Sequence, residues 1–292
     1  MIRLEVRRIS RLFNVVGVVS RTDRKKALEL AKRLINHLET KGITIFLEPR
    51  LAKHLNRTAA ALPLEKMKPD LIITIGGDGT ILRTCLTIPK PEPPILAINM
   101  GVRGFLTEAS PKDGLVALDT CLEGKFSLER YMKLASFVGE VRMPDALNEV
   151  FITSPAPAKI LYAKVWKDGV LVAECRADGM VIASQVGSTG YSLSGGGPVL
   201  DPELDAFVVT PICPLTVFHP IVFSTKSTIN IELLKPKKAI VVLDGHLQKE
   251  MEPRRNRITI IRSEYETTFI RFKEDFYHRL KGRLLFPRGE RG

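Results

Sequence analysis

The sequence contains few of the residues that would indicate a nucleic-acid platform, a disulfide framework or a zinc site. Only one Trp and five Tyr occur among 292 residues, and no basic cluster is interleaved with aromatic residues, so surfaces that stack on bases are not indicated. The cysteines form no CxxC pair and have no His-rich neighbourhood, which argues against disulfides and zinc. This pattern predicts reduced thiols in a cytoplasmic protein. The four cysteines are Cys85, Cys121, Cys175 and Cys213.

The sequence also lacks a segment suited to spanning a membrane or directing secretion. The longest apolar stretch, residues 207–223, contains three prolines and a histidine, which do not fit a transmembrane helix. The apolar run Val15–Val19 is too short for the hydrophobic region of a signal peptide, and the charged segment Arg21–Arg24 follows at once. We therefore expect a cytoplasmic protein without membrane association.

Basic residues outnumber acidic ones. Lys and Arg total 44 against 32 Asp and Glu, which gives a formal net charge of +12. Such a charge attracts polyanions, but nucleotides, polyphosphate and nucleic acid all qualify. Charge alone does not choose among these partners, and a well-solvated basic surface is the simpler interpretation.

The first 125 residues alternate short apolar runs with segments of helical periodicity. Leu71–Ile75 is apolar or β-branched on both faces, as expected for a central parallel strand. Between residues 23 and 40 the apolar positions recur on one helical face, and Gly42 follows where a C-terminal cap would lie. This alternation indicates an α/β domain with an open, doubly wound sheet. The predicted elements are strands at 13–19, 43–47, 71–75 and 94–99, and helices at 23–40, 81–88 and 110–124.

After Phe126 the sequence changes to successive strand-like runs separated by turn signals. Lys167-Asp168-Gly169, between two such runs, is a strong hairpin signal. We predict an all-β second domain over residues 126–272. We expect a C-terminal helix at 273–285 to pack back on the first domain, which then comprises residues 1–125 and 273–292. The predicted strands are 159–166, 170–175, 228–234, 239–243, 258–262 and 267–272, with a Lys-Pro-Lys-Lys turn at 235–238.

The segment Gly76–Thr80, with the sequence Gly-Gly-Asp-Gly-Thr, lies between the predicted central strand and a helix. Ligands of open α/β sheets bind at the carboxyl ends of the strands, and glycines let backbone N–H groups approach phosphate oxygens. A carboxylate there is useful if it accepts a proton from an attacking hydroxyl or holds a divalent metal, so Asp78 is the candidate base. A helix N-cap is the structural alternative for Asp78. Arg83, one turn later, faces the same phosphates or is simply solvated.

Two further segments are candidates for ligand binding. The loop from Gly187 to Pro198 is rich in glycine and small hydroxyl residues, and such a loop can wrap a flat polar ligand while Tyr191 stacks on a ring. A flexible linker is the alternative interpretation, but Tyr191 and Leu193 are apolar anchors within it. In Leu147–Val150, Asn148 can pair with an adenine edge and its Glu neighbour can accept from ribose hydroxyls, although an exposed strand-edge turn is more common.

These three segments, in this order, resemble the NAD kinase family. Gly-Gly-Asp-Gly-Thr alone is shared with diacylglycerol and sphingosine kinases, whereas the Gly187–Pro198 loop is far more specific. The resemblance implies an NAD kinase that phosphorylates the 2′-hydroxyl of the adenosine ribose of NAD to give NADP, with ATP or polyphosphate as donor. The likeness runs from about Val15 to the C-terminal helix and also includes Asn99–Glu108, Ile212–Pro214, Pro220–Val222 and Asp244-Gly245.

The resemblance implies a role for each matching residue. Asp78 takes the proton from the ribose hydroxyl, and the backbone of Gly76–Thr80 holds the donor phosphates, which a divalent metal, Mg²⁺, bridges. Asn148 and Glu149 bind the adenosine part of NAD. The implied NAD contacts are Asp78, Gly79, Asn148, Glu149, Lys159, Arg176, Asp178, Val186, Thr189, Gly190, Tyr191, Ser192, Ser194 and His246, and the implied donor-phosphate contacts are Gly76, Gly77, Gly79, Thr80 and Arg83.

The resemblance also implies a homodimer or homotetramer, in which Arg176 often reaches over from a neighbouring subunit. This chain departs from the family pattern at several positions. The usual Thr-Pro-Thr-Gly-Ser-Thr-Ala-Tyr is Ser-Gln-Val-Gly-Ser-Thr-Gly-Tyr at residues 184–191, the usual Cys-Pro-His is Cys-Pro-Leu at 213–215, and His246 stands near a frequent Gln. These differences concern donor choice, affinity and the preference between NAD and NADH, and they leave the proposed base in place.

Three other functions are alternatives, and the residues argue against the first two. In a lipid kinase the Asn-Glu pair usually lies within one helix of the glycine motif, whereas Asn148 is 70 residues beyond Asp78. A sugar-phosphate kinase needs several Arg or His residues converging on a second phosphate, and we locate none. A non-catalytic binder of nucleotides or nucleic acid would use the net charge, with a steep salt dependence of binding, and would tolerate Asp78→Asn.

Overall fold

The fold is described from a computed structural model, which covers residues 12–101, 104–156, 159–236, 238–251, 256–272 and 276–284. The chain forms two compact units. Unit 1 comprises Met1–Ile81, Pro93–Glu129 and Phe269–Gly292, and unit 2 comprises Leu82–Glu92 and Arg130–Thr268. The domain boundaries proposed from the sequence stay a prediction, and each unit is described by itself.

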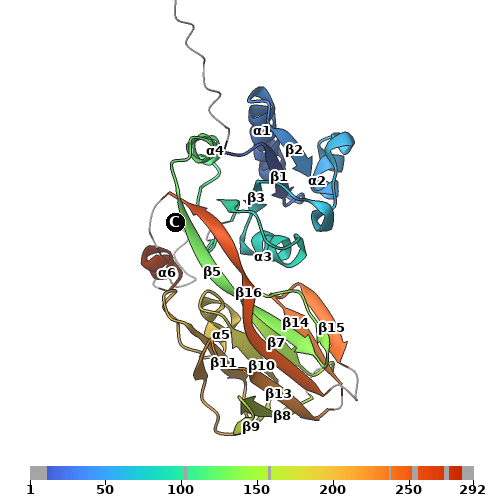
Figure 1. Cartoon of the computed structure of the whole chain (residues 1–292), viewed down its shortest axis with the longest axis vertical. Coiled ribbons are helices and arrows are strands. Elements are labelled where there is room, and N and C mark those ends of the chain that lie inside the picture. The colour runs from blue at the N-terminus through green and yellow to red at the C-terminus, as the bar shows by residue number, and fades with distance from the viewer. Residues whose placement is uncertain are drawn as a thin grey trace, which may run out of the picture. The chain divides into compact units, whose positions relative to one another are not determined.

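Unit 1 contains a parallel sheet whose strands are the apolar runs expected from the sequence (Figure 1). Every residue of the third strand in chain order is buried, as a strand covered on both faces requires. Phe269, near the end of β16 (Arg257–Arg271), pairs in parallel with Ile95 and so extends the sheet. In their order across the sheet, the other strands are β2 (Thr44–Leu47), β1 (Val15–Ser20), β3 (Leu71–Gly76) and β4 (Ile95–Asn99).

Helices α1 (Lys25–Thr40) and α4 (Gly114–Leu122) share one apolar core with alternate residues of β1, β3 and β4. The buried positions of α1 recur every three or four residues, which is the helical stripe predicted from the sequence. Helix α4 begins four residues later than predicted, and in the turn before it the Ser110 hydroxyl donates to the Asp113 carboxylate. The remaining helical segments of unit 1, with α3 continuing into unit 2, are α2 (Pro49–His54), η1 (Thr58–Ala60), η2 (Leu64–Lys66), α3 (Asp78–Thr87) and α6 (Phe276–Leu284).

The C-terminal helix packs on unit 1, as predicted. Phe276 at the start of α6 is buried, and its ring meets that of Phe105 edge-on with a centroid distance of 5.5 Å. Residues 273–275 and Leu285, which belong to the predicted helix, lie outside the described residues. None of the helices in the described ranges is both long and apolar enough to cross a membrane.

Unit 2 is built almost entirely from β-strands, as predicted (Figure 1). Its six-stranded antiparallel sheet has the order β12-β11-β10-β7-β14-β15, and a second set of strands follows the order β16-β13-β8-β9. Alternate residues of both sets form one apolar core. The strands are β5 (Ser127–Val138), which begins in unit 1, β6 (Val141–Arg142), β7 (Glu149–Thr153), β8 (Leu161–Lys167), β9 (Val170–Ala177), β10 (Gly179–Ala183), β11 (Ala206–Ile212), β12 (Ile221–Ser224), β13 (Ile229–Lys235), β14 (Ala239–Leu243) and β15 (Leu247–Met251).

The structure confirms one predicted hairpin and corrects one other expectation. Strands β8 and β9 pair across Asp168 and Gly169, both of which have positive φ. The runs on either side of the Lys-Pro-Lys-Lys turn do not pair with each other, because β13 pairs with β8 and β16 whereas β14 pairs with β7 and β15. The two short strands expected at 258–262 and 267–272 are parts of one continuous strand, β16.

Candidate functional site

A glycine turn joins β3 to α3 at the carboxyl end of the parallel sheet of unit 1. Gly76 is the last residue of β3, and a Cβ atom there would lie 2.1 Å from Oγ1 and 2.7 Å from Cβ of Thr80. The Thr80 N–H donates to the Gly77 carbonyl at 2.9 Å, which closes the turn. Nothing lies within 4 Å of the position that a Cβ atom of Gly77 would occupy. Gly76 is therefore required by packing, whereas Gly77 faces open space.

The carboxylate of Asp78 is held beside this turn. Its Oδ2 accepts the Phe105 N–H and its Oδ1 accepts the Leu106 N–H, each at 3.0 Å. The side chain is half-buried, so it is fixed in orientation and still accessible. Asp78 starts α3, but these contacts come from a segment that follows β4, and they make it more than a helix cap. The ends of β3 and β4 are neighbours, since Gly76 pairs with Asn99.

A buried arginine, which no sequence pattern indicated, anchors the segment that holds Asp78. Arg271 is 2% exposed and donates to the Leu106 carbonyl at 3.0 Å. Its guanidinium also pairs with Glu108 at 3.3 Å and with Glu129. The Leu106 residue therefore binds Asp78 through its N–H and Arg271 through its carbonyl. No local pattern could reveal this, because Arg271 is 165 residues away from Leu106.

The other residues predicted to contact the donor lie on the same turn or on α3. Gly79 is exposed, and Thr80 and Arg83 are half-buried. Asn99 uses its side-chain oxygen to accept the Gly101 N–H at 2.8 Å, which shapes the chain beside the turn. Val102 and Arg103, in the glycine-rich stretch that follows, lie outside the described residues. The arrangement presents backbone N–H groups, an open glycine and a carboxylate at one sheet edge, which suits a phosphate chain next to an acceptor of protons.

The predicted adenosine pair, Asn148 and Glu149, starts β7 in unit 2. The Asn148 Oδ1 atom is buried and has no hydrogen-bond partner among the described residues. Both side chains border Gly190, where a Cβ atom would lie 3.4 Å from Glu149 Oε2 and 3.7 Å from Asn148 Nδ2. A buried amide oxygen without a donor is costly, so it indicates a place for a ligand N–H.

Asp244 is the residue of this region that the sequence did not single out for a role. Its Oδ2 accepts the Leu147 N–H at 2.8 Å, and its Oδ1 accepts the N–H groups of Asn148 at 2.8 Å and Glu149 at 3.0 Å. The side chain is 3% exposed, and burial raises the pKa of its carboxyl against the opposing effect of the three amides. The available signal was the Asp-Gly pair between two strand-like runs, which predicts a hairpin turn but not its partner.

The Gly187–Pro198 loop is ordered and packs on the six-stranded sheet. It forms a 3-10 turn, η3 (Gly187–Thr189), and a short helix, α5 (Tyr191–Ser194). Thr189 and Ser192 are buried, and their hydroxyls bond the Val186 carbonyl and Thr210, both at 2.8 Å. Val186 is also buried, so these three side chains shape the loop from within.

Tyr191 and Ser194 are the exposed side chains of this loop among the predicted contacts. The Tyr191 ring is 40% exposed and meets the Phe151 ring edge-on, with centroids 5.0 Å apart. Partial burial raises the pKa of its hydroxyl, and the negative charges of Asp178 and Glu149 add to the effect. A ring fixed on one edge and open on the other can cover a flat ligand.

The remaining predicted contacts of unit 2 divide between two ends of the β7–β10 pair. Glu149 pairs with Ala183 at one end and Thr153 with Gly179 at the other, roughly 13 Å of strand apart. His246, two residues after Asp244, is exposed at the Glu149 end. The other end holds Lys159, Arg176 and Asp178, all exposed, where the Arg176 guanidinium lies 4.9 Å from the centre of the Tyr162 ring.

A buried ion cluster in unit 2 is a second feature that the sequence did not indicate. Lys133 is 0% exposed, pairs with Glu92, and donates to the Cys85 carbonyl at 3.0 Å. Lys90 also pairs with Glu92, and Thr267 donates to that carboxylate at 2.7 Å. Burial opposes ionisation of Glu92, but the two ammonium groups outweigh it and lower the pKa of the carboxyl.

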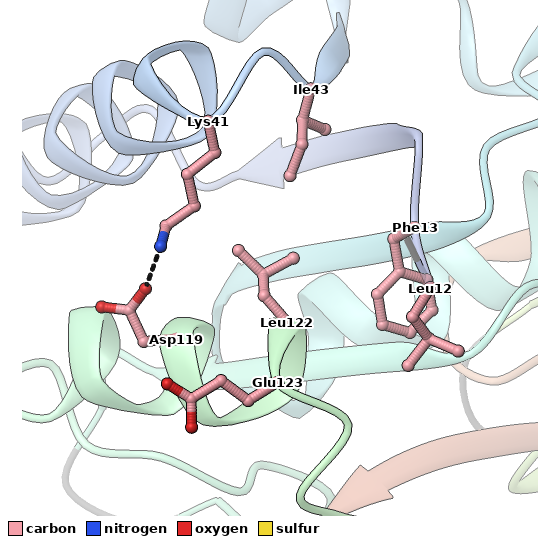
Figure 2. Close-up of a pocket in the computed structure, with 7 residues that line it drawn as sticks. All are labelled: Leu12, Phe13, Lys41, Ile43, Asp119, Leu122 and Glu123. Carbon is pink, nitrogen blue, oxygen red and sulfur yellow. Dashed lines mark ion pairs between the residues drawn. The ribbon is translucent and has the colours of Figure 1, made fainter. Parts of the chain in front are cut away.

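A cavity of about 310 Å³ in unit 1 lies away from the predicted site (Figure 2). Phe13, Ile43 and Leu122 line it, and Lys41 and Asp119 form an ion pair of 2.9 Å at its side. Phe13 and Ile43 immediately precede β1 and β2, so the cavity lies at the amino ends of the parallel strands. Asp78 lies at their carboxyl ends, which is where ligands of such sheets bind.

Unit 1 thus holds a glycine turn with an adjoining carboxylate, which suits a phosphate chain, and unit 2 holds an Asn-Glu pair beside a glycine loop, which suits a nucleotide. Comparison with known proteins makes this specific. Residues 16–126 match the family model of the ATP-NAD kinase N-terminal domain, and residues 147–272 match that of the ATP-NAD kinase C-terminal domain. The chain belongs to the NAD kinase family.

Individual relatives agree with this assignment. The NAD kinase of Methanothermobacter thermautotrophicus is 40% identical over 273 residues, which cover 92% of this chain and 96% of the relative. The NAD kinase of Pyrococcus furiosus is 39% identical over 265 residues, covering 89% and 95%. The crystal structure of an NAD kinase from Archaeoglobus fulgidus in complex with ATP has 35% identity and a TM-score of 0.76, covering 92% of this chain and 98% of the other. Yeast NADH kinase complexed with NADH has 22% identity, a TM-score of 0.85 and coverage of 95% and 89%, and shares the fold.

Proposed function

We propose that this chain transfers the γ-phosphoryl group of ATP to the 2′-hydroxyl of the adenosine ribose of NAD, giving NADP and ADP. The observation that carries the proposal is the carboxylate of Asp78, which two backbone amides orient beside an open glycine turn at the end of a buried strand. ATP is the preferred donor in the proposal, because the related Archaeoglobus fulgidus enzyme was crystallised with ATP. Polyphosphate is the alternative donor.

The donor phosphates bind the backbone of Gly76–Thr80, with Arg83 as a further cation. A side chain at Gly77 would intrude where nothing now lies within 4 Å, so the glycine leaves room for a phosphate oxygen to reach the backbone. Gly79, which is exposed, extends the same surface. These residues account for binding of the phosphate chain without help from a large basic cluster.

Unit 2 binds the dinucleotide. The buried Asn148 Oδ1 accepts an N–H from the adenine, and Glu149 accepts from ribose hydroxyls. The exposed side of the Tyr191 ring covers the adenine, and Gly190 leaves space beside the Asn-Glu pair. Lys159, Arg176 and Asp178 contact the more distant part of the ligand, and Ser194 and His246 lie at its rim.

In the chemical step the 2′-oxygen attacks the γ-phosphorus, the bond from that phosphorus to the bridging β-oxygen breaks, and ADP leaves. The hydroxyl proton passes to a carboxylate oxygen of Asp78. Two backbone N–H groups hold this carboxylate in orientation, and its half-buried position leaves it accessible to the hydroxyl. Orientation contributes most of the remaining rate enhancement in phosphoryl transfer.

Mg²⁺ enters the proposal as the MgATP complex. Among the described residues no group of three or more His, Cys, Asp or Glu side chains could hold a metal ion. This fits an ion that would be held mainly by the phosphate oxygens of ATP and by water. Such an ion neutralises charge that develops on the phosphates.

We also propose a homo-oligomer in the cytoplasm. The edge strand β9 exposes Val170, Leu171 and Val172, and Val217 is 94% exposed, which is more apolar surface than an edge strand usually leaves to water. The four cysteines are unpaired, and three of them are buried, as suits a reducing compartment.

Turnover of purified protein with NAD, tested separately with MgATP and with polyphosphate, decides the activity and the donor. We expect Asp78→Asn to bind NAD with a dissociation constant within a few-fold of the unsubstituted protein while kcat falls by about 10²–10⁴-fold. Asp70→Asn is the matched control, because Asp70 also accepts two backbone N–H groups, from Asn14 and Val15, at the other end of β3. Absence of NADP with both donors would refute the activity, and normal turnover of Asp78→Asn would refute the role of the base.

A further inference from the structure

Asp244 lies in a strained turn that brings its carboxylate onto the backbone of another strand. The residue has φ +48° and Gly245 has φ +68°, and together they connect β14 to β15. For a residue with a side chain this conformation is uncommon and needs support from its surroundings. The support consists of three hydrogen bonds to consecutive N–H groups, those of Leu147, Asn148 and Glu149.

The same backbone is held from its other side. The Ser184 hydroxyl donates to the Leu147 carbonyl at 2.5 Å, and the Ser184 N–H donates to the Asn148 carbonyl at 2.9 Å. Gly187 packs so closely on that carbonyl that a Cβ atom would lie 1.9 Å from its oxygen. The N–H groups of Leu147, Asn148 and Glu149 are thus fixed by one carboxylate, and the carbonyls of Leu147 and Asn148 are fixed by residues 184–187.

We propose that Asp244 is a positioning residue for NAD binding, which holds Asn148 and Glu149 in the geometry that receives the adenosine without touching the dinucleotide itself. The inference rests on the proposed function and adds a residue to it. A direct contact is ruled out by burial, since the side chain is 3% exposed and both oxygens already accept N–H groups.

The chemistry of the site requires a carboxylate and not its amide. Three N–H donors share two oxygens, one of which accepts two of them. In Asp244→Asn one oxygen becomes an NH₂ donor, so either the Leu147 amide or the pair from Asn148 and Glu149 faces another donor. A buried donor left in this way shifts the segment, and we expect NAD affinity to fall by roughly 5- to 150-fold.

The test is a double-mutant cycle on the full chain. The dissociation constant of NAD is measured by calorimetry, without donor, for the unsubstituted protein, Asp244→Asn, Asn148→Ala and the double variant. We expect each single variant to bind more weakly and the two effects to be less than additive in the double variant, because Asp244 acts in part through Asn148 and in part through Glu149. The KM for ATP stays unchanged in Asp244→Asn.

Asp168→Asn is the matched control. Asp168 has φ +50° in an Asp-Gly hairpin turn of the same unit, and its carboxylate accepts the Thr228 N–H at 2.8 Å. We expect this variant to bind NAD normally even where its melting temperature falls. Equal weakening in both variants would mean that any disturbed hairpin reduces binding, which overturns the specific role of Asp244.

Hydrogen exchange of the unsubstituted protein gives a measurement that does not depend on a variant folding. We expect the amides of Leu147, Asn148 and Glu149 to be as strongly protected without NAD as those in the middle of β7. Protection that develops only when NAD is added, or normal NAD binding by folded Asp244→Asn, overturns the proposal. Failure of the unsubstituted protein to bind NAD at all would instead refute the proposed function.

Discussion

Alanine substitutions at two neighbouring glycines of the turn are expected to have different effects, one on folding and one on donor binding. Gly76→Ala places a methyl group 2.1 Å from Thr80 Oγ1 and 2.7 Å from its Cβ. Rotation of the Thr80 side chain can move its oxygen but not its Cβ, so the backbone has to shift. Gly77→Ala places a methyl group where nothing lies within 4 Å, and Gly77 does not have positive φ.

The expected changes in stability follow from these distances. Overpacking at Gly76 costs about 1–3 kcal/mol, and at roughly 2–4 °C per kcal/mol this lowers the melting temperature by several degrees. Gly77→Ala restricts the unfolded chain without a clash, so the free energy of unfolding stays the same or rises by about 0.4–1 kcal/mol. The first substitution therefore acts on folding, and the second does not.

For donor binding, the clear expectation concerns Gly77→Ala. A methyl group at Gly77 keeps a phosphate oxygen from the backbone N–H, and loss of one hydrogen bond to a charged group costs about 1.5–3 kcal/mol. The KM for ATP should therefore rise by roughly 10- to 150-fold in Gly77→Ala, while the dissociation constant of NAD stays unchanged.

Thermal unfolding and initial-rate kinetics on the two variants decide the matter. The reasoning is refuted if Gly77→Ala folds normally and keeps its KM for ATP, because the open space would then not be the place of the donor phosphates. It is equally refuted if Gly76→Ala melts at the original temperature, since the packing of Thr80 would then not require the glycine.

Further substitutions in unit 2 test the buried charges around Glu92 and the ring of Tyr191, which we propose covers the adenine. Lys133→Met removes one partner of Glu92 and should lower the free energy of unfolding by about 3–5 kcal/mol, measured by urea denaturation. Because the pKa of Glu92 is lowered in the folded protein, its contribution to stability is present above the ordinary carboxyl range and is lost as the pH falls. The free energy of unfolding of Lys133→Met should therefore change less with acid than that of the unsubstituted protein. Tyr191→Ala should weaken NAD binding by about 5- to 30-fold, whereas Tyr191→Phe, which keeps the ring on Phe151, should stay within about three-fold in the same calorimetric assay.

The sequence was sufficient where structure depends on neighbouring residues. The strands of unit 1 are buried on both faces and therefore read as continuous apolar runs, and α1 shows its buried stripe directly. It was insufficient where two alternating strands had to be assigned to partners. β13 and β14 both alternate and flank a good turn, yet they pair with different strands, because register and partner depend on surfaces far away in the chain.

The buried charges were hidden for the same reason. Lys133 lies in an apolar strand at a position where a lysine normally indicates an exposed face, and its partner Glu92 is 41 residues away. Arg271 and Leu106 are separated by 165 residues. In each pair, one member resembles an ordinary surface residue in the sequence, and only the folded structure shows that it is buried in contact with its partner.

Three Asp-Gly pairs show how much of the function can be predicted from local sequence. Asp78, Asp168 and Asp244 each precede a glycine and each accept backbone N–H groups, so motif and hydrogen bonding alone do not separate them. The three residues differ in the accessibility of their carboxylates and in the segments that these carboxylates contact. Asp168 closes an exposed hairpin, and Asp244 is buried on the segment that carries Asn148, whereas Asp78 stays half-buried at the end of a parallel strand beside a glycine with open space. Only the last combination leaves a fixed carboxylate that can meet a hydroxyl, which is why we propose Asp78 for the proton transfer.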